Sequence, residues 1–276
     1  MKTPQEKIRK AKEILSSLLK SGKTLAIHYA CQSFTSETKI GTPTIVAISI
    51  RNVKTGENRL FSLLHSAEKL GKKITLNPED ILQFEKHMLK MFFSYIKNFK
   101  THNWIHWNMS NDTYGFHALE HRANTLNIRN LFIIDDEHKC NLVGLLCGIY
   151  GTHKFAPHKL TTEENIEYRG QLNTLLALNK DISAKDLIAG DLEPIKFEEL
   201  KWKEINLSTQ RKTACIAEIA KQAELGKLQT QSSYWCRHGG FFHGIKDFLS
   251  NFWFGLIGGI IGGLSGIITL YKTFCE

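Results

Sequence analysis

NWIHWNMSNDTYGFHALEHRANTL, residues 103–126, contains two different patterns one after the other. Residues 103–109 form a short apolar run rich in aromatic side chains and bounded by polar residues, which is typical of a buried strand. Residues 113–126 repeat apolar side chains at helical spacing, with Phe116 and Leu119 on one face. The stretch therefore predicts a strand followed directly by a helix.

Before this stretch the sequence predicts a helix, three strands and a second helix, at residues 3–21, 24–31, 42–53, 58–66 and 78–99. The turn at Gly56 between two β-rich runs indicates a hairpin. Pro78 opens the second helix, and Glu79 and Asp80 lie in its first turn, where helices favour negative charge. A strand, a hairpin, a helix, a strand and a helix thus follow one another.

Beyond residue 126 the pattern becomes helical, at residues 140–151, 166–179, 184–191 and 208–225. Ser208 and Thr209 are suitable caps for the last of these helices, and Gly226 is a suitable terminator. With a crossover helix between the hairpin and the next strand, the order predicts a mixed sheet flanked by helices. The expected fold class is α/β, with a helical C-terminal half.

Composition and charge narrow the classes of function. The chain has 276 residues and a formal net charge of +9, which favours anionic partners such as nucleic acid or an anionic membrane surface. The alternative is that the lysines only keep the protein soluble. Six cysteines without a C-x-x-C pair, and a charged start without a secretory signal pattern, indicate a reducing intracellular compartment.

The C-terminal stretch FLSNFWFGLIGGIIGGLSGIITLYK, residues 248–272, predicts a transmembrane helix. Between Asn251 and Lys272 there are twenty uncharged residues, and at about 1.5 Å per residue they span about 30 Å, the thickness of the hydrocarbon core. The expected organisation is a soluble domain over residues 1–230, a juxtamembrane linker over 231–247, and a single membrane span. The N-terminal domain is expected on the cytoplasmic side.

Glycines recur every four residues in this span, and they predict contact between helices. In lipid, small residues let helix backbones approach closely, so self-association into a homo-oligomer is one interpretation. The other is a plain anchor. The glycines form two ridges: Gly255, Gly259 and Gly263, and Gly258, Gly262 and Gly266.

The order of elements resembles the ribonuclease H-like fold, and specifically the DEDD 3′ to 5′ exonuclease superfamily. Residues 104–123 (WIHWNMSNDTYGFHALEHRA) occupy the place of that family's H-N-x-x-F-D strand and helix, and residues 208–223 that of its final helix. The resemblance covers roughly residues 24–225 in element order, with motif likeness confined to the H-x-N region. It implies an RNase H-like domain that binds nucleic acid or a nucleotide.

The acids of that family are mostly replaced. The first strand has His28, Tyr29 and Cys31 in place of the two acids of D-x-E, and the final helix has Arg211 and Lys212 where an acid is expected. Asp112 is the one match. Because two-metal cleavage needs several carboxylates, the resemblance implies a degenerate exonuclease that holds its ligand without cutting it, and no cofactor.

The residues that this interpretation assigns to ligand binding are His28, His106, Asn108, Tyr114, Arg211 and Lys212. Further basic residues are suited to phosphate contacts: Lys139, Lys154, Lys159 and Arg169. Trp104, Trp107 and Phe116, like Tyr114, are able to stack on bases, although aromatic residues in a strand and the helix after it more often belong to the core.

Two alternatives remain open. One is an active metal-dependent nuclease using Mg²⁺ or Mn²⁺, with Asp112, Glu120, Asp135 and Asp136 as its carboxylates. The other is a membrane-tethered module that binds another protein. The hypothesis favoured by the pattern as a whole is a membrane-anchored, catalytically inactive sensor of nucleic acid or nucleotide, similar in architecture to antiviral or stress-response proteins.

HALEH, residues 117–121, also matches H-x-x-E-H, the signature of inverted zinc proteases. On a helix His117 and His121 lie one turn apart on the same face, and a further glutamate downstream is needed as a ligand. That ligand could come from Glu193, Glu198 or Glu199. The alternative is a polar helix face without metal.

Overall fold

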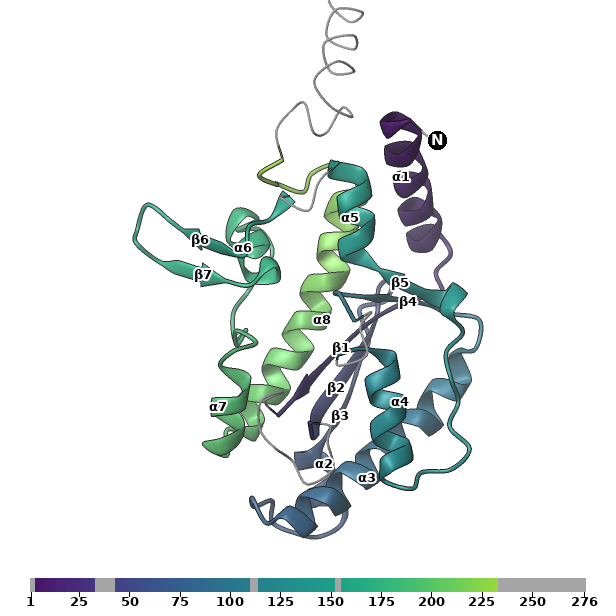
Figure 1. Cartoon of the computed structure of the whole chain (residues 1–276), viewed down its shortest axis with the longest axis vertical. Helices are drawn as coiled ribbons and strands as arrows, with labels where there is room; N and C mark the ends of the chain where they lie inside the picture. Colours follow the sequence, from purple (N-terminus) through teal and green to yellow (C-terminus); the bar gives the residue numbers. More distant parts are fainter. Residues whose placement is uncertain (1–2, 33–42, 110–113, 152–154, 233–276) are drawn as a thin grey trace, which may run out of the picture.

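A five-stranded sheet with helices on both faces forms the centre of the fold (Figure 1). In this computed structural model, residues 3–32, 43–109, 114–151 and 155–232 are described. The strands are β1 (Thr24–Cys31), β2 (Ile45–Asn52), β3 (Asn58–Ser62), β4 (Asn103–His106) and β5 (Lys139–Asn141). Their order is β3-β2-β1-β4-β5, in which β2 is antiparallel to β1 and β3, and β4 is parallel to β1 and β5.

The central strand β1 is buried along its whole length. Its run TLAIHYAC is nearly continuous in apolar residues, as is expected of a strand that has elements on both faces. Leu25, Ile27 and Tyr29 point to one face, and Ala26 points to the other. The bounds of β1 are those predicted from the sequence.

Eight helices and a separate hairpin surround the sheet in the described residues: α1 (Pro4–Lys20), α2 (Leu63–Lys69), α3 (Pro78–Ile96), α4 (Phe116–Thr125), α5 (Leu142–Tyr150), α6 (Gln171–Leu178), α7 (Glu193–Glu198), α8 (Trp202–Glu224), β6 (Lys159–Thr161) and β7 (Glu167–Arg169). Local sequence signals fix several of their ends. Thr3 and Glu6 form a capping box at the start of α1, and Asn77 caps α3 ahead of Pro78.

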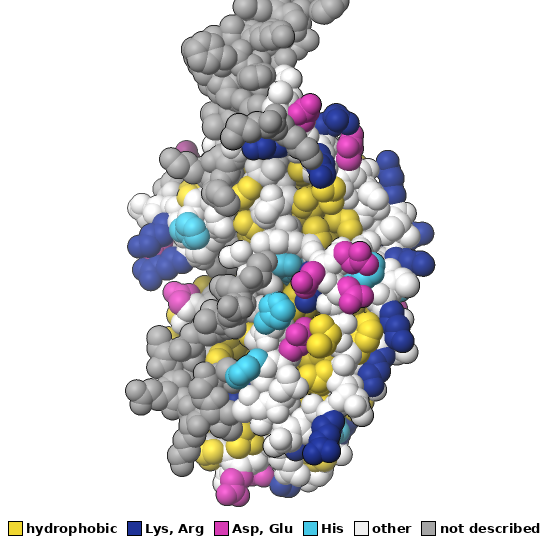
Figure 2. Space-filling view, turned by 45° about the vertical axis from the view of Figure 1, so that its right-hand side comes forward, with side chains coloured by type: hydrophobic (Ala, Val, Ile, Leu, Met, Phe, Trp, Pro, Cys, Tyr) yellow, Lys and Arg dark blue, Asp and Glu magenta, His cyan; other side chains and the backbone are white. Residues whose placement is uncertain are grey.

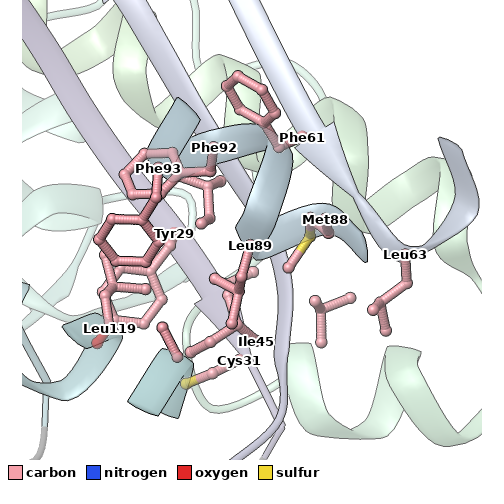
Figure 3. Close-up of a cluster of buried hydrophobic side chains, with 14 of the residues drawn as sticks. Tyr29, Cys31, Ile45, Phe61, Leu63, Met88, Leu89, Phe92, Phe93 and Leu119 are labelled. Carbon is pink, nitrogen blue, oxygen red and sulfur yellow. The ribbon is translucent and has the colours of Figure 1, made fainter. Parts of the chain in front are cut away.

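Two hydrophobic cores lie on the two faces of the sheet. On one face, side chains of β1, β2 and β3 meet α3 and α4, and Figure 3 shows Phe92, Phe93 and Leu89 packed near Tyr29 and Leu119. On the other face, α1, α5, α6 and α8 pack together over Ala26 and its neighbours. Each face of the sheet is thus buried by helices from different parts of the sequence.

A buried ion pair holds the first of these cores to the start of β2. The carboxylate of Glu85 on α3 accepts hydrogen bonds from Arg122 Nε at 2.8 Å and from Arg122 Nη2 at 2.6 Å. It also accepts the backbone N–H of Ile45 at 2.7 Å, beside the irregularity in the pairing of β1 with β2. Burial raises the pKa of Glu85, while the Arg122 bonds act in the opposite direction.

Helix α5 approaches α1 closely at Gly148. A Cβ atom on Gly148 would lie 2.9 Å from the Cβ of Ala11, closer than side-chain atoms approach one another. We therefore expect Gly148→Ala to destabilise the protein by about 1–2 kcal/mol, because the two helices must separate.

Gly144, one turn earlier in α5, is the matched control. Its nearest neighbour would be the Cβ of Asn141 at 4.0 Å, so Gly144→Ala should stabilise the protein by about 0.5–1 kcal/mol through helix propensity. Urea unfolding of the two variants measures both changes. Equal stabilities would show that the Gly148 contact does not limit the approach of α1.

The fold class predicted from the sequence needs a correction at its C-terminal end. It includes a transmembrane helix, but no helix of the described residues is both long enough and apolar enough to cross a membrane. Residues 248–272, and with them the six glycines of the predicted ridges, lie outside the described residues. For residues 3–232 the fold class is a mixed five-stranded sheet with flanking helices.

The helical C-terminal half is also corrected. Residues Lys139–Asn141 form β5, because they pair with β4 before α5 begins. Residues 166–169 belong to the hairpin of β6 and β7, not to the helix that follows. The stretch 184–191 lacks helix, and α7 starts just after it at Glu193. Helix α8 begins at Trp202, six residues earlier than predicted.

Candidate functional site

Four segments of the chain bring polar side chains together at one end of the sheet. Strands β1 and β4 are parallel, with Ile27 beside His106, so their carboxyl ends lie at the same edge. Helix α8 packs across β1 and β2. His28 from β1, Tyr114 from the segment after β4, and Lys212 from α8 meet there, and Glu193 from α7 joins them.

The hydrogen bonds of Tyr114 determine the tautomer of His28. The Tyr114 hydroxyl donates to the carbonyl of Tyr29 at 3.0 Å, and its oxygen lies 3.2 Å from His28 Nδ1. A hydroxyl has one hydrogen, so Nδ1 of His28 must be the donor in the second contact. His28 Nε2 therefore carries a lone pair, and this buried atom has no hydrogen-bond partner in the described structure.

Burial also keeps the His28 ring neutral. The side chain is only 8% exposed, and burial lowers its pKa well below the usual value, with a further contribution from the positive charge of Lys212. The Cys31 thiol at the end of the same strand has its pKa raised to about 12 by burial, so it stays protonated. The site offers a hydrogen-bond acceptor at Nε2 and no thiolate nucleophile from Cys31.

Lys212 and Glu193 form a second buried ion pair. Lys212 Nζ lies 2.6 Å from Glu193 Oε1, and both residues are less than 10% exposed. Burial raises the pKa of Glu193, whereas Lys212 lowers it. Beside Lys212, Thr213 contacts Ser49 of β2 through a hydroxyl pair at 2.7 Å, which fixes α8 on the sheet. The charge of Lys212 is therefore already balanced by Glu193.

The other residues assigned to ligand binding are not brought into this group. His106 points to the opposite face of the sheet from His28, where it lies against Phe116, and its Nδ1 accepts the N–H of Met109. Asn108 adopts a positive φ of 53° and bonds through its N–H to Asn141 at 3.3 Å. Arg211 is half-buried on α8.

Of the carboxylates proposed for an active nuclease, Glu120, Asp135 and Asp136 lie near α4 and β5. Glu120 lies 4.0 Å from Lys139 and 3.6 Å from His117, and Asp136 lies 2.8 Å from Lys139. Figure 2 shows acidic and histidine side chains gathered near the middle of one face. Asp135 is exposed, and Asp112 lies outside the described residues.

Geometry suited to a metal occurs once in the part of the chain that the structure describes. Asp135, Glu137 and His138 place ligand atoms within 4.8 Å of one another, at an exposed turn before β5. His117 and His121 of HALEH are exposed on α4 and belong to no such group among these residues. Glu193, which the zinc interpretation offers as a ligand, is held by Lys212 instead.

The aromatic residues belong mainly to the interior. Trp104 and Phe116 are buried in the first core, so they present no open face to a base. Trp107 is half-buried against Phe155. Tyr114 is held by His28 and Tyr29. These positions agree with the interpretation of the aromatic residues as core.

Sequence reasoning offered Glu193 only as a zinc ligand and missed its pairing with Lys212. Glu193 lies 19 residues before Lys212 on a six-residue helix, and neither spacing nor charge pattern in the sequence links the two.

No family model, curated protein or solved structure matches the chain.

Proposed function

We propose that this domain binds a nucleotide or a polynucleotide through phosphate groups and does not cleave it. The observation that carries the proposal is the group around His28 of β1: a lysine, a neutral histidine and a paired carboxylate. Two-metal cleavage needs several carboxylates around its cations, and Lys212 would repel a metal ion there. A cation and an uncharged acceptor suit an anionic ligand instead.

The chemistry of the individual groups supports this assignment. The ammonium group of Lys212 is a suitable partner for a phosphate oxygen, but Lys212 and His28 are both buried, so a ligand reaches them only in exchange for Glu193. The lone pair on His28 Nε2 accepts a hydrogen bond, and a sugar hydroxyl is a suitable donor. The order of the described elements, with a late helix packed on the central strands, supports the resemblance to RNase H-like domains, and the net charge of +9 favours a polyanion.

Binding and cleavage can be separated in one assay on the full chain. End-labelled single-stranded DNA and RNA are incubated with Mn²⁺ or with EDTA, at low and at high salt. We expect the strands to be retained without shortening in either case, with retention that weakens as salt increases. Metal-dependent shortening would overturn the non-cleaving proposal. Absence of any retention would instead favour a protein partner.

A charge-neutral double variant tests the site itself. Glu193→Gln with Lys212→Met removes both buried charges together, so neither is left unpaired. We expect nucleic-acid affinity to fall about tenfold, with a decrease of about one in the salt slope. The exposed pair of Lys196 with Glu199, at 3.0 Å, provides the control Lys196→Met with Glu199→Gln. An equal loss in both variants would assign binding to general surface charge.

A further inference from the structure

The hairpin of β6 and β7 extends from the body of the molecule (Figure 1). Its strands pair antiparallel over three residues each, with Leu160 opposite Tyr168 at the centre and Thr161 opposite Glu167. These two strands form a sheet of their own. Because an isolated two-stranded hairpin is only marginally stable in water, added strands would strengthen it.

The outer edge of β7 has backbone groups available for another strand. The bonds from Thr162 N to Ile166 O and from Gly170 N to His158 O mark the bonded pairs on either side of Tyr168. Since bonded and non-bonded pairs alternate, the N–H and C=O groups of Glu167 and Arg169 point outward. Of these four groups, only the Arg169 carbonyl has a hydrogen-bond partner in the described structure. It accepts a hydrogen bond from the side chain of Asn173.

The charged side chains on the β7 edge of one copy are complementary to those of a second, antiparallel copy. If two copies of β7 pair antiparallel with Tyr168 opposite Tyr168, then Glu167 of each copy faces Arg169 of the other. Glu167 and Arg169 are also the residues whose backbone N–H and C=O groups point outward. The same register therefore forms the backbone hydrogen bonds between the two copies and places opposite charges across from one another. The Glu167 and Arg169 side chains are 46% and 58% exposed, and they now pair within one strand at 2.6 Å.

There is space beside this edge. A cleft of about 1110 Å³ lies between the hairpin and the segment leading into α7, and Tyr168, Leu187 and Leu192 are among its lining residues. A strand added to β7 would have this cleft beside it. We propose that a second copy of this chain binds here, and that two hairpins join into a four-stranded sheet about a two-fold axis.

Charge exchange between copies gives the sharpest test. Glu167→Arg and Arg169→Glu each place like charges opposite one another in the dimer, so each variant alone should dimerise about tenfold more weakly than the native chain. Mixed in equal amounts, the two variants restore both opposite-charge pairs, and the heterodimer should recover. Sedimentation of the full-length proteins over a range of concentrations measures this.

Each outcome of that test decides the proposal. Recovery in the mixture supports it, because an ion pair within one strand has no means of producing complementation between chains. Single variants that associate like the native chain, or a native chain that stays monomeric at its highest soluble concentration, would overturn it. Neither result depends on whether the domain binds nucleic acid.

A backbone test complements the charge test. Glu167→Pro removes an outward N–H from the β7 edge, whereas Thr161→Pro removes one from the opposite edge, on β6. We expect dimerisation to be lost in the first variant and retained in the second, with equal circular dichroism showing that both are folded. Dimerisation that survives Glu167→Pro, or is lost equally in both variants, would contradict pairing through β7.

Discussion

Arg122→Met is expected to destabilise the protein by about 3–5 kcal/mol, because it leaves the buried Glu85 carboxylate without its cation. Glu85 is fully buried, and Arg122 is 1% exposed. The loss should reach beyond the pair itself, since the same carboxylate holds the N–H of Ile45 at the start of β2. Urea unfolding of the full chain measures the change in the free energy of unfolding.

Two further variants distinguish an unpaired charge from a lost side chain. Adding Glu85→Gln to Arg122→Met keeps an acceptor for Ile45 and removes the charge, so most of the lost stability should return. Arg9→Met breaks the exposed pair with Glu13, at 2.8 Å, and should cost less than about 1 kcal/mol. If Arg122→Met were as mild as Arg9→Met, the buried pair would have no special role.

Mild acid is expected to weaken the fold by about 3 kcal/mol through His106. Burial lowers the pKa of this side chain to about 4, with a further contribution from Lys139, against 6.5 for an unperturbed histidine. The difference of 2.5, at 1.36 kcal/mol for each pKa unit, gives about 3 kcal/mol. The protonated ring also loses its acceptor at Nδ1, which takes the N–H of Met109.

The direction in which stability changes with pH follows from which state, folded or unfolded, binds the proton at the higher pH. The unfolded chain takes up the proton near pH 6.5, while the folded chain resists it until about pH 4. The contribution of His106 is therefore complete above pH 6.5 and is lost as the pH falls toward 4. His28 acts in the same direction, since burial lowers its pKa as well.

Unfolding free energies measured from pH 7.5 to 4.5 test this prediction. His106→Asn keeps an acceptor for Met109 without a titrating ring, so its curve should be flatter than that of the native chain. His121→Asn, at an exposed position of α4, controls for the substitution. Parallel curves for the native chain and His106→Asn would assign the acid sensitivity to other groups.

The parts of the fold that sequence predicts best are those with strong local signals. Strand β1 has the predicted bounds because its apolar run is continuous, and α3 starts as predicted at Pro78. Strand β5 was missed because Lys139, Cys140 and Asn141 have no strand pattern of their own, and pairing with β4 alone makes them a strand. Tertiary contacts, not local preference, determine that element.

The candidate site shows the same limit. The sequence places His28 in a strand and Lys212 in the last long helix, and the fold brings the two close enough for the charge of Lys212 to lower the pKa of His28. It does not show that His106 points to the opposite face, because the register of β4 against β1 is not readable from one sequence. Nor does it show that Glu193 neutralises Lys212.

The position of α8 also has a consequence for the order in which the protein forms. The meander of β1, β2 and β3 is complete by residue 62, but the helix that packs across β1 and β2 spans Trp202–Glu224. During synthesis from the N-terminus, the part of the sheet that α8 covers therefore stays open while about 140 further residues are added. Contacts so distant in sequence form slowly, so the growing chain depends on late residues to bury an early core.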